Sequence, residues 1–184
     1  QEQSGFIDSV GYELYTKLVE EAISGKEVFK EIDPKDNEVY APRHIDPEYI
    51  PFDEVRIEIH KRISELNSLS DVELLKEELL DRFGPIDHDL RLYMYEKLFK
   101  KLSYRLGILK TEQVPKAIKF KFTLEATRRM NNKDFVERIN SFEQKVQLDF
   151  ERGHLVMKID LSKIQEHWLY IGCNLFEHLL IKHS

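Results

Sequence analysis

Four carboxylates on one predicted helix carry the most chemical information in this sequence. They are Glu73, Glu77, Glu78 and Asp81. Side chains three or four residues apart share a face of a helix, so we expect these groups to form one acidic surface. Only two cations, Lys76 and Arg82, stand among them. Such a surface performs no reaction by itself, and its charge favours docking onto a basic protein surface.

The helix that carries these acids has the clearest pattern in the chain. Its apolar residues recur at helical spacing and predict one buried stripe, namely Val72, Leu75, Leu79 and Phe83. Ser70 and Glu73 have the spacing of a capping box, which predicts that the helix begins at Ser70. Gly84 and Pro85 predict its end, because glycine closes helices and proline cannot continue them.

The sequence offers no pattern for catalysis or for metal binding. The glycines form no phosphate-binding loop, and the histidines lack the His-Glu-x-x-His spacing of a zinc site. Cys173 lies among Ile171, Leu175 and Phe176, so we expect it to be a small buried hydrophobic residue. We therefore predict no catalytic residue, no metal ligand and no cofactor in this chain.

Composition sets further bounds. The net charge of −6 disfavours a strong non-specific grip on nucleic acid phosphates. A single cysteine allows no internal disulfide, and no apolar run is long enough to span a membrane, so we expect a cytoplasmic protein. The chain opens with Gln1 and has no initiator methionine. We expect it to be a piece of a larger protein whose natural C-terminus lies near Ser184.

Periodicity predicts an α+β fold with the element order ααα-β-α-ββ-α, preceded by a helix at residues 10–23 and an extended arm. Three helices are expected first, at residues 54–67, 70–83 and 87–106, with Asp53 and Asp87 as caps of the first and third. The other expected elements are a strand at 118–122, a helix at 132–142, a hairpin of strands 146–150 and 155–159, and a last helix capped by Ser162. We divide the chain into an arm, residues 1–50, and a C-terminal domain, residues 51–184.

A second charged surface leaves an alternative open. The third predicted helix has a basic face, to which the first predicted strand adds two lysines; the residues are Lys97, Lys100, Lys101, Arg105, Lys119 and Lys121. This surface either contacts nucleic acid or is simply solvated. The neighbouring aromatic residues Tyr95 and Phe99 fall on the side of the helix that should be buried, where they would not stack on bases.

Several motifs in the first 110 residues occur in the order found in one known family. Residues 1–15 contain Gln-Glu-Gln-Ser-Gly and then Gly-Tyr-Glu-Leu-Tyr, residues 45–51 read Ile-Asp-Pro-Glu-Tyr-Ile-Pro, and residues 78–85 read Glu-Leu-Leu-Asp-Arg-Phe-Gly-Pro. Residues 60–63 read His-Lys-Arg-Ile, with His60 where the family has an aromatic residue. Together they resemble the end of the RecG-like translocase motif and the C-terminal (TRCF) domain of bacterial transcription-repair coupling factors, the Mfd family. The last part of the chain matches this family only in its α/β pattern.

The resemblance implies a regulatory domain without catalysis of its own. In this family the parent protein is a DNA-dependent ATPase that uses ATP and magnesium, binds duplex DNA, displaces stalled RNA polymerase and recruits UvrA. The C-terminal domain would dock on the UvrB-like N-terminal module of the same protein and mask the UvrA-binding surface, which is autoinhibition.

On this interpretation the acidic face is the intramolecular lock. We expect Glu78 and Asp81 to be its main contacts, with Glu73 and Glu77 as further contacts. Gln3 stands near the place of the motor glutamine that couples ATP turnover to movement on DNA, although we expect no action of Gln3 within this chain. Two alternatives stay open: the carboxylates only keep the domain solvated, or the domain is a nucleic-acid-binding accessory domain of a RecG-like helicase.

Overall fold

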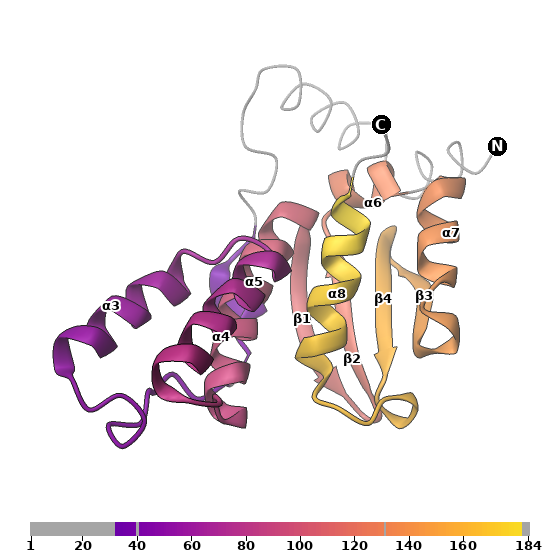
Figure 1. Ribbon diagram of the computed structural model, residues 1–184. Helices are drawn as coiled ribbons and strands as arrows, with labels where there is room; N and C mark the ends of the chain where they lie inside the picture. The colour runs from indigo at the N-terminus through magenta and orange to yellow at the C-terminus, as the bar shows by residue number, and fades with distance from the viewer. Residues whose placement is uncertain (1–31, 40, 131, 182–184) are drawn as a thin grey trace.

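A four-stranded antiparallel sheet in the order β1-β2-β4-β3 organises the structure. The computed structural model describes residues 32–39, 41–130 and 132–181. Helices α5 and α8 pack against each other, and α8 crosses one face of the sheet, while α3 and α4 gather on the far side of α5 (Figure 1). This arrangement confirms the predicted α+β fold.

The element bounds are as follows. The helices are α3 (Asp53–Ser64), α4 (Leu69–Phe83), α5 (His88–Leu106), α6 (Leu124–Met130), α7 (Lys133–Asn140) and α8 (Trp168–Leu180). The strands are β1 (Ile108–Val114), β2 (Ala117–Phe122), β3 (Val146–Glu151) and β4 (His154–Asp160). Short 3-10 turns are η1 (Pro34–Asn37), η2 (Glu143–Lys145) and η3 (Leu161–Lys163).

The ends of α5 and α3 show where local signals suffice. The Asp87 carboxylate accepts a hydrogen bond from the Leu90 N–H at 2.7 Å, as predicted, and Gly107 closes α5 with a φ of 85°. The predicted Asp53 cap of α3 is wrong. Asp53 is the first residue of the helix and its carboxylate binds Arg56 one turn later, so it makes an ion pair instead of a cap.

Strand β1 is missing from the sequence prediction. It pairs with β2, and Thr111, directly opposite the buried Phe120, is only half-buried. The Thr111 hydroxyl donates a hydrogen bond to Asn37 of η1 at 2.6 Å, and the Asn37 amide donates to the Ile108 carbonyl at 2.9 Å. The core-facing side chain of Thr111 is therefore hydrogen-bonded to Asn37 instead of being packed among apolar groups. As a result, β1 lacks the alternation of apolar residues that identifies most strands in a sequence.

The last helix begins later than predicted. Asp160, rather than Ser162, acts as a cap, and it caps the turn η3 instead of a helix. The N-cap of α8 is His167, whose Nδ1 atom accepts a hydrogen bond from the Leu169 N–H at 3.1 Å. The sequence also missed the short helix α6, which the Thr123 hydroxyl caps through the Ala126 N–H at 3.1 Å.

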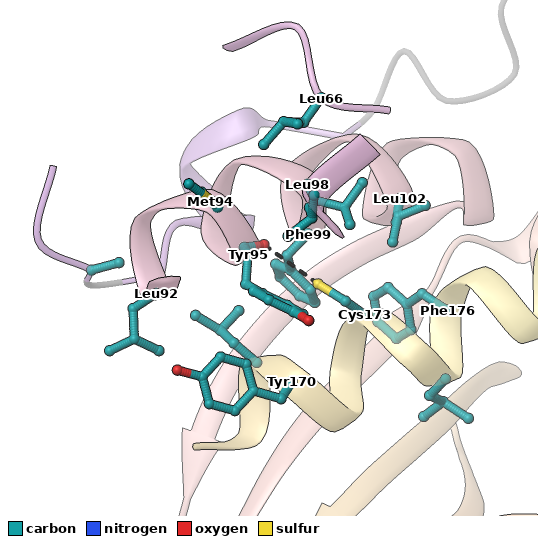
Figure 2. Packing of buried hydrophobic residues seen from close by; sticks show 14 of the residues in the cluster. Leu66, Leu92, Met94, Tyr95, Leu98, Phe99, Leu102, Tyr170, Cys173 and Phe176 are labelled. Carbon is teal, nitrogen blue, oxygen red and sulfur yellow. Dashed lines mark hydrogen bonds between the residues drawn. The ribbon is translucent and has the colours of Figure 1, made fainter. Parts of the chain in front are cut away.

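The core is densest where α5 and α8 meet over β2. Phe99 of α5 stacks on Phe176 of α8 at a centroid distance of 5.1 Å, and Phe120 of β2 lies 4.8 Å from the same ring. Beside them the Cys173 thiol points at the Tyr95 carbonyl, 3.4 Å away (Figure 2). Cys173 is fully buried, as predicted, and burial raises the pKa of its thiol.

The segment before α3 is part of this core. Ile45 and Ile50 are almost completely buried, and Arg43 donates a hydrogen bond to Glu96 of α5 at 2.8 Å. Glu96 is itself fully buried and also binds Lys100 at 3.2 Å. The segment 41–50 is thus packed against the helices, and the division of the chain at residue 50 stays a prediction.

Candidate protein interface

Helix α4, which carries the predicted acidic surface, has its cap two residues earlier than the capping box predicted, at Ser68, and its first residue is Leu69. The Ser68 hydroxyl, not that of Ser70, accepts a hydrogen bond from the Asp71 N–H at 3.1 Å. Asp71 in turn accepts one from the Asn67 N–H at 3.0 Å. The second bond goes to the residue before the cap, so it is not the reciprocal pairing of a capping box, and the prediction of Ser70 as cap and first residue is wrong.

The buried side of α4 is the one the sequence predicts. Val72, Leu75 and Leu79 are buried, and Phe83 is half-buried. The helix ends at Gly84, whose φ of 89° and ψ of −174° form a conformation that residues with a side chain avoid. The far side of α4 must therefore face away from the core.

A tyrosine from the preceding segment fixes this end of the helix. The Tyr49 hydroxyl donates a hydrogen bond to the Gly84 carbonyl at 2.7 Å, and its ring meets Phe83 edge-on at 6.0 Å. The position of the acidic surface relative to the core is therefore set by α4 packing and by Tyr49 together.

Glu78 is the most constrained of the four carboxylates. Arg62 of α3 and Arg82 of α4 both bind its Oε2 atom, the latter at 3.1 Å. The hydrogen bond from Arg62 is the largest cause that holds the pKa of Glu78 below its ordinary value. Glu78 therefore stays ionised at neutral pH and anchors two cations beside the acidic surface.

The other three carboxylates are more exposed. Glu73 binds Lys76 at 3.1 Å, three residues along the same helix. Glu77 and Asp81 are exposed, and neither forms an ion pair with any residue that the structure describes. These two lie four residues apart on the outer side of α4, so they offer adjacent charges to an approaching surface.

Two leucines accompany the acids, and the sequence prediction missed them. Leu74 is 62% exposed and Leu80 is 55% exposed. Leu74 lies three residues before Glu77, and Leu80 lies three residues after it. The two leucines therefore flank the exposed acids on the helix surface. The sequence could have shown this exposure, because Leu74 and Leu80 do not share the helical spacing of the buried stripe formed by Val72, Leu75 and Leu79. We call Glu73, Leu74, Glu77, Glu78, Leu80 and Asp81 the α4 surface.

Two of the six basic residues behind the nucleic-acid alternative, Lys100 and Lys119, form ion pairs with carboxylates. Lys100 binds the buried Glu96. Lys119 binds Glu151 at 2.5 Å and Glu112 at 3.6 Å, and these contacts raise the pKa of Lys119. A cation already paired with a carboxylate is a poor ligand for a phosphate, so these two lysines contribute little to a phosphate-binding surface.

The last predicted site residue, Gln3, belongs to a part of the chain that the structure does not describe. Gln3 and the predicted helix at residues 10–23 lie outside the described residues. Within the described ranges, no group of three histidine, cysteine or acidic side chains could hold a metal ion. Over the same ranges, no helix has both the length and the apolar character needed to cross a bilayer.

Comparison with known proteins decides the family. A family model described as the TRCF domain matches residues 39–133, which is more than half of the chain. The chain belongs to the TRCF domain family. The α4 surface lies inside the matched range, and so does the segment that carries Arg43, Ile45 and Ile50.

Curated relatives of this chain are much longer proteins. The chain is 29% identical over 175 residues to the transcription-repair-coupling factor of Staphylococcus haemolyticus (strain JCSC1435), covering 92% of this chain and 14% of the relative. It is 26% identical over 173 residues to that of Staphylococcus aureus (strain USA300), covering 92% and 15%. The chain thus spans about a seventh of the length of these curated relatives.

A solved structure has the same fold. The crystal structure of a C-terminal domain of transcription-repair coupling factor superposes with a TM-score of 0.61 and 23% sequence identity. The match covers 78% of this chain and 88% of that chain. The fold of a TRCF domain therefore extends beyond residue 133, into the part of the chain that the family model does not match.

Proposed function

We propose that this chain is the C-terminal regulatory domain of a transcription-repair coupling factor, and that its α4 surface docks on the UvrB-like N-terminal module of the same protein. Docking would mask the UvrA-binding surface until RNA polymerase is engaged. The parent would be a cytoplasmic DNA-dependent ATPase that uses ATP and magnesium and moves on duplex DNA. The domain itself would supply no catalytic residue.

The α4 surface is the observation that carries this proposal. Exposed acids with no partner gain Coulomb energy when a basic surface approaches, and the flanking leucines gain from leaving water. Exposed ion pairs contribute only about 0–1 kcal/mol each, so a contact built from Glu77, Asp81 and two leucines is specific but reversible. Reversibility suits a lock that must open.

The four carboxylates have different roles in this proposal. Glu77 and Asp81 are free to pair with cations of the module, and Glu73 can exchange Lys76 for one of them. Glu78 keeps Arg62 and Arg82 beside the surface, so an incoming cation has to compete with both. Glu78 and Asp81 remain the pair whose reversal should disturb docking most, because reversing Glu78 also sets a lysine against two arginines.

The test uses the full-length parent protein and purified UvrA. Glu78→Lys combined with Asp81→Lys should release UvrA binding, measured by pull-down or by biolayer interferometry, while the wild type stays masked. A second variant, Glu77→Lys with Asp81→Lys, removes the charges without disturbing the two arginines. Both should act in the same direction.

A matched control lies on α7. Asp134→Lys with Glu137→Lys reverses two partly exposed carboxylates with the same spacing, whose side chains are 50% and 62% exposed. This control should leave UvrA binding masked. If both α4 variants keep a native urea midpoint and UvrA binding stays masked, the α4 surface is not the lock.

A further inference from the structure

A groove on the other side of the molecule from α3 lies between α8 and the chain that follows α7. It has a volume of about 720 Å³, within the range of known ligand sites. One wall is α8 with the loop before it, and the other is formed by the residues at the end of α7 and in η2. Phe142, Ile164 and Ile171 give it an apolar lining.

Contacts across the groove hold its two walls together. The Phe142 ring meets His178 of α8 edge-on at 5.6 Å, and the Ser141 hydroxyl lies 3.5 Å from the same imidazole. The Lys163 ammonium donates a hydrogen bond to the Gln144 side-chain oxygen at 3.0 Å. The groove is therefore a formed feature rather than a gap between independent elements.

Two lysines provide the positive charge of the groove. Lys145 and Lys163 come from facing walls, and neither forms an ion pair with a described residue. The His167 Nδ1 atom accepts the helix-capping hydrogen bond, which leaves the proton of the neutral ring on Nε2 as a further donor.

Carboxylates near the rim are already engaged. Glu166 belongs to the groove lining, its side chain is 70% exposed, and its carboxylate lies 3.9 Å from Arg91. The Asp160 carboxylate interacts electrostatically with the Lys163 ammonium. It also accepts two hydrogen bonds from Ser162, one from the N–H at 3.0 Å and one from the hydroxyl at 2.6 Å. The lining thus holds two ammonium groups, those of Lys145 and Lys163, against the one carboxylate of Glu166, a small positive excess on a chain whose net charge is −6.

We propose that this groove binds an acidic peptide segment, with an apolar side chain against Phe142, Ile164 and Ile171 and a carboxylate between Lys145 and Lys163. An apolar lining with two facing ammonium groups fits alternating apolar and acidic residues. A nucleic acid strand fits less well, because its phosphates need a longer row of cations than these two lysines provide. This site is separate from the α4 surface and does not depend on its role.

Trp168, the only tryptophan of the chain, can report on binding, because its ring stacks at 5.9 Å on that of His167, which lines the groove. The 184-residue chain should be titrated with the acetylated peptide Leu-Asp-Leu-Glu-Leu, and Trp168 fluorescence should change saturably below about 1 mM peptide. Lys145→Glu with Lys163→Glu should weaken binding roughly tenfold or more, since each lost pair is replaced by repulsion. Lys133→Glu is the control, because its side chain on α7 is 90% exposed and outside the groove.

Three results would overturn the proposal. The first is no saturable change with the acidic peptide on a folded chain. The second is equal binding of the matched peptide Leu-Lys-Leu-Lys-Leu, which would show that charge plays no part. The third is tighter binding of an oligothymidylate, which would assign the groove to nucleic acid.

Discussion

Arg43→Ala tests whether the segment before α3 is held by charge as well as by burial. Glu96 is fully buried, and its Oε1 atom takes Arg43 at 2.8 Å and Lys100 at 3.2 Å. The other oxygen, Oε2, is buried without a hydrogen-bond partner. Removing Arg43 therefore leaves a buried carboxylate that depends on one lysine.

The magnitude follows from the burial of the two partners. Breaking a fully buried ion pair costs about 3–5 kcal/mol, and an exposed pair contributes about 0–1 kcal/mol. The Arg43 side chain is 43% exposed and Lys100 remains in place, so the cost should lie between these limits. We expect a loss of about 2 kcal/mol in the free energy of unfolding.

Urea denaturation of the 184-residue chain measures this loss. With a denaturant slope of about 2 kcal/mol per molar, the midpoint should fall by about 1 M. A double-mutant cycle with Glu96→Gln isolates the pair, because Arg43→Ala should cost much less when the carboxylate is already neutral. Equal costs in both backgrounds would refute the reasoning, since the arginine would then act through packing alone.

Two further predictions concern single residues. Burial, and the charge of nearby His88, lower the pKa of His167, so the unfolded chain takes up this proton first and the free energy of unfolding should fall as the pH drops below about 6.5. His167→Asn keeps a capping side chain that does not titrate, so the urea midpoint should depend less steeply on pH. The pH dependence that remains should come from His60, whose pKa is also lowered by burial. An unchanged slope of midpoint against pH would contradict this prediction. Gly84→Ala should lower the free energy of unfolding by about 1–3 kcal/mol through backbone strain alone, because a Cβ there meets nothing within 4 Å. An unchanged thermal midpoint would show that α4 can end in another conformation.

The buried side of α4 was predictable because it depends on local spacing. Val72, Leu75 and Leu79 recur at the helical period, and that period holds whatever the helix packs against. The start of the helix was not fixed in the same way. Ser68 and Ser70 are both good caps, and the choice depends on the turn that α3 and α4 share.

Long-range partners account for what the sequence could not reveal. Thr111 of β1 is paired with Asn37, 74 residues away, so no local pattern marks the strand. Glu78 was expected to be free for docking, but Arg62 of the preceding helix reaches it once α3 and α4 pack together. The exposed Leu74 and Leu80 were visible in the helical spacing, although the four acids beside them dominated the interpretation.

The position of Cys173 makes the thiol a natural reporter of opening. It is the single cysteine of the chain, it is fully buried, and its neighbour is the Tyr95 carbonyl across the α5–α8 contact. A thiol reagent can reach it only when the two helices separate, and its raised pKa keeps it unreactive until then. The labelling rate of the unmodified protein therefore measures how often this helix pair comes apart.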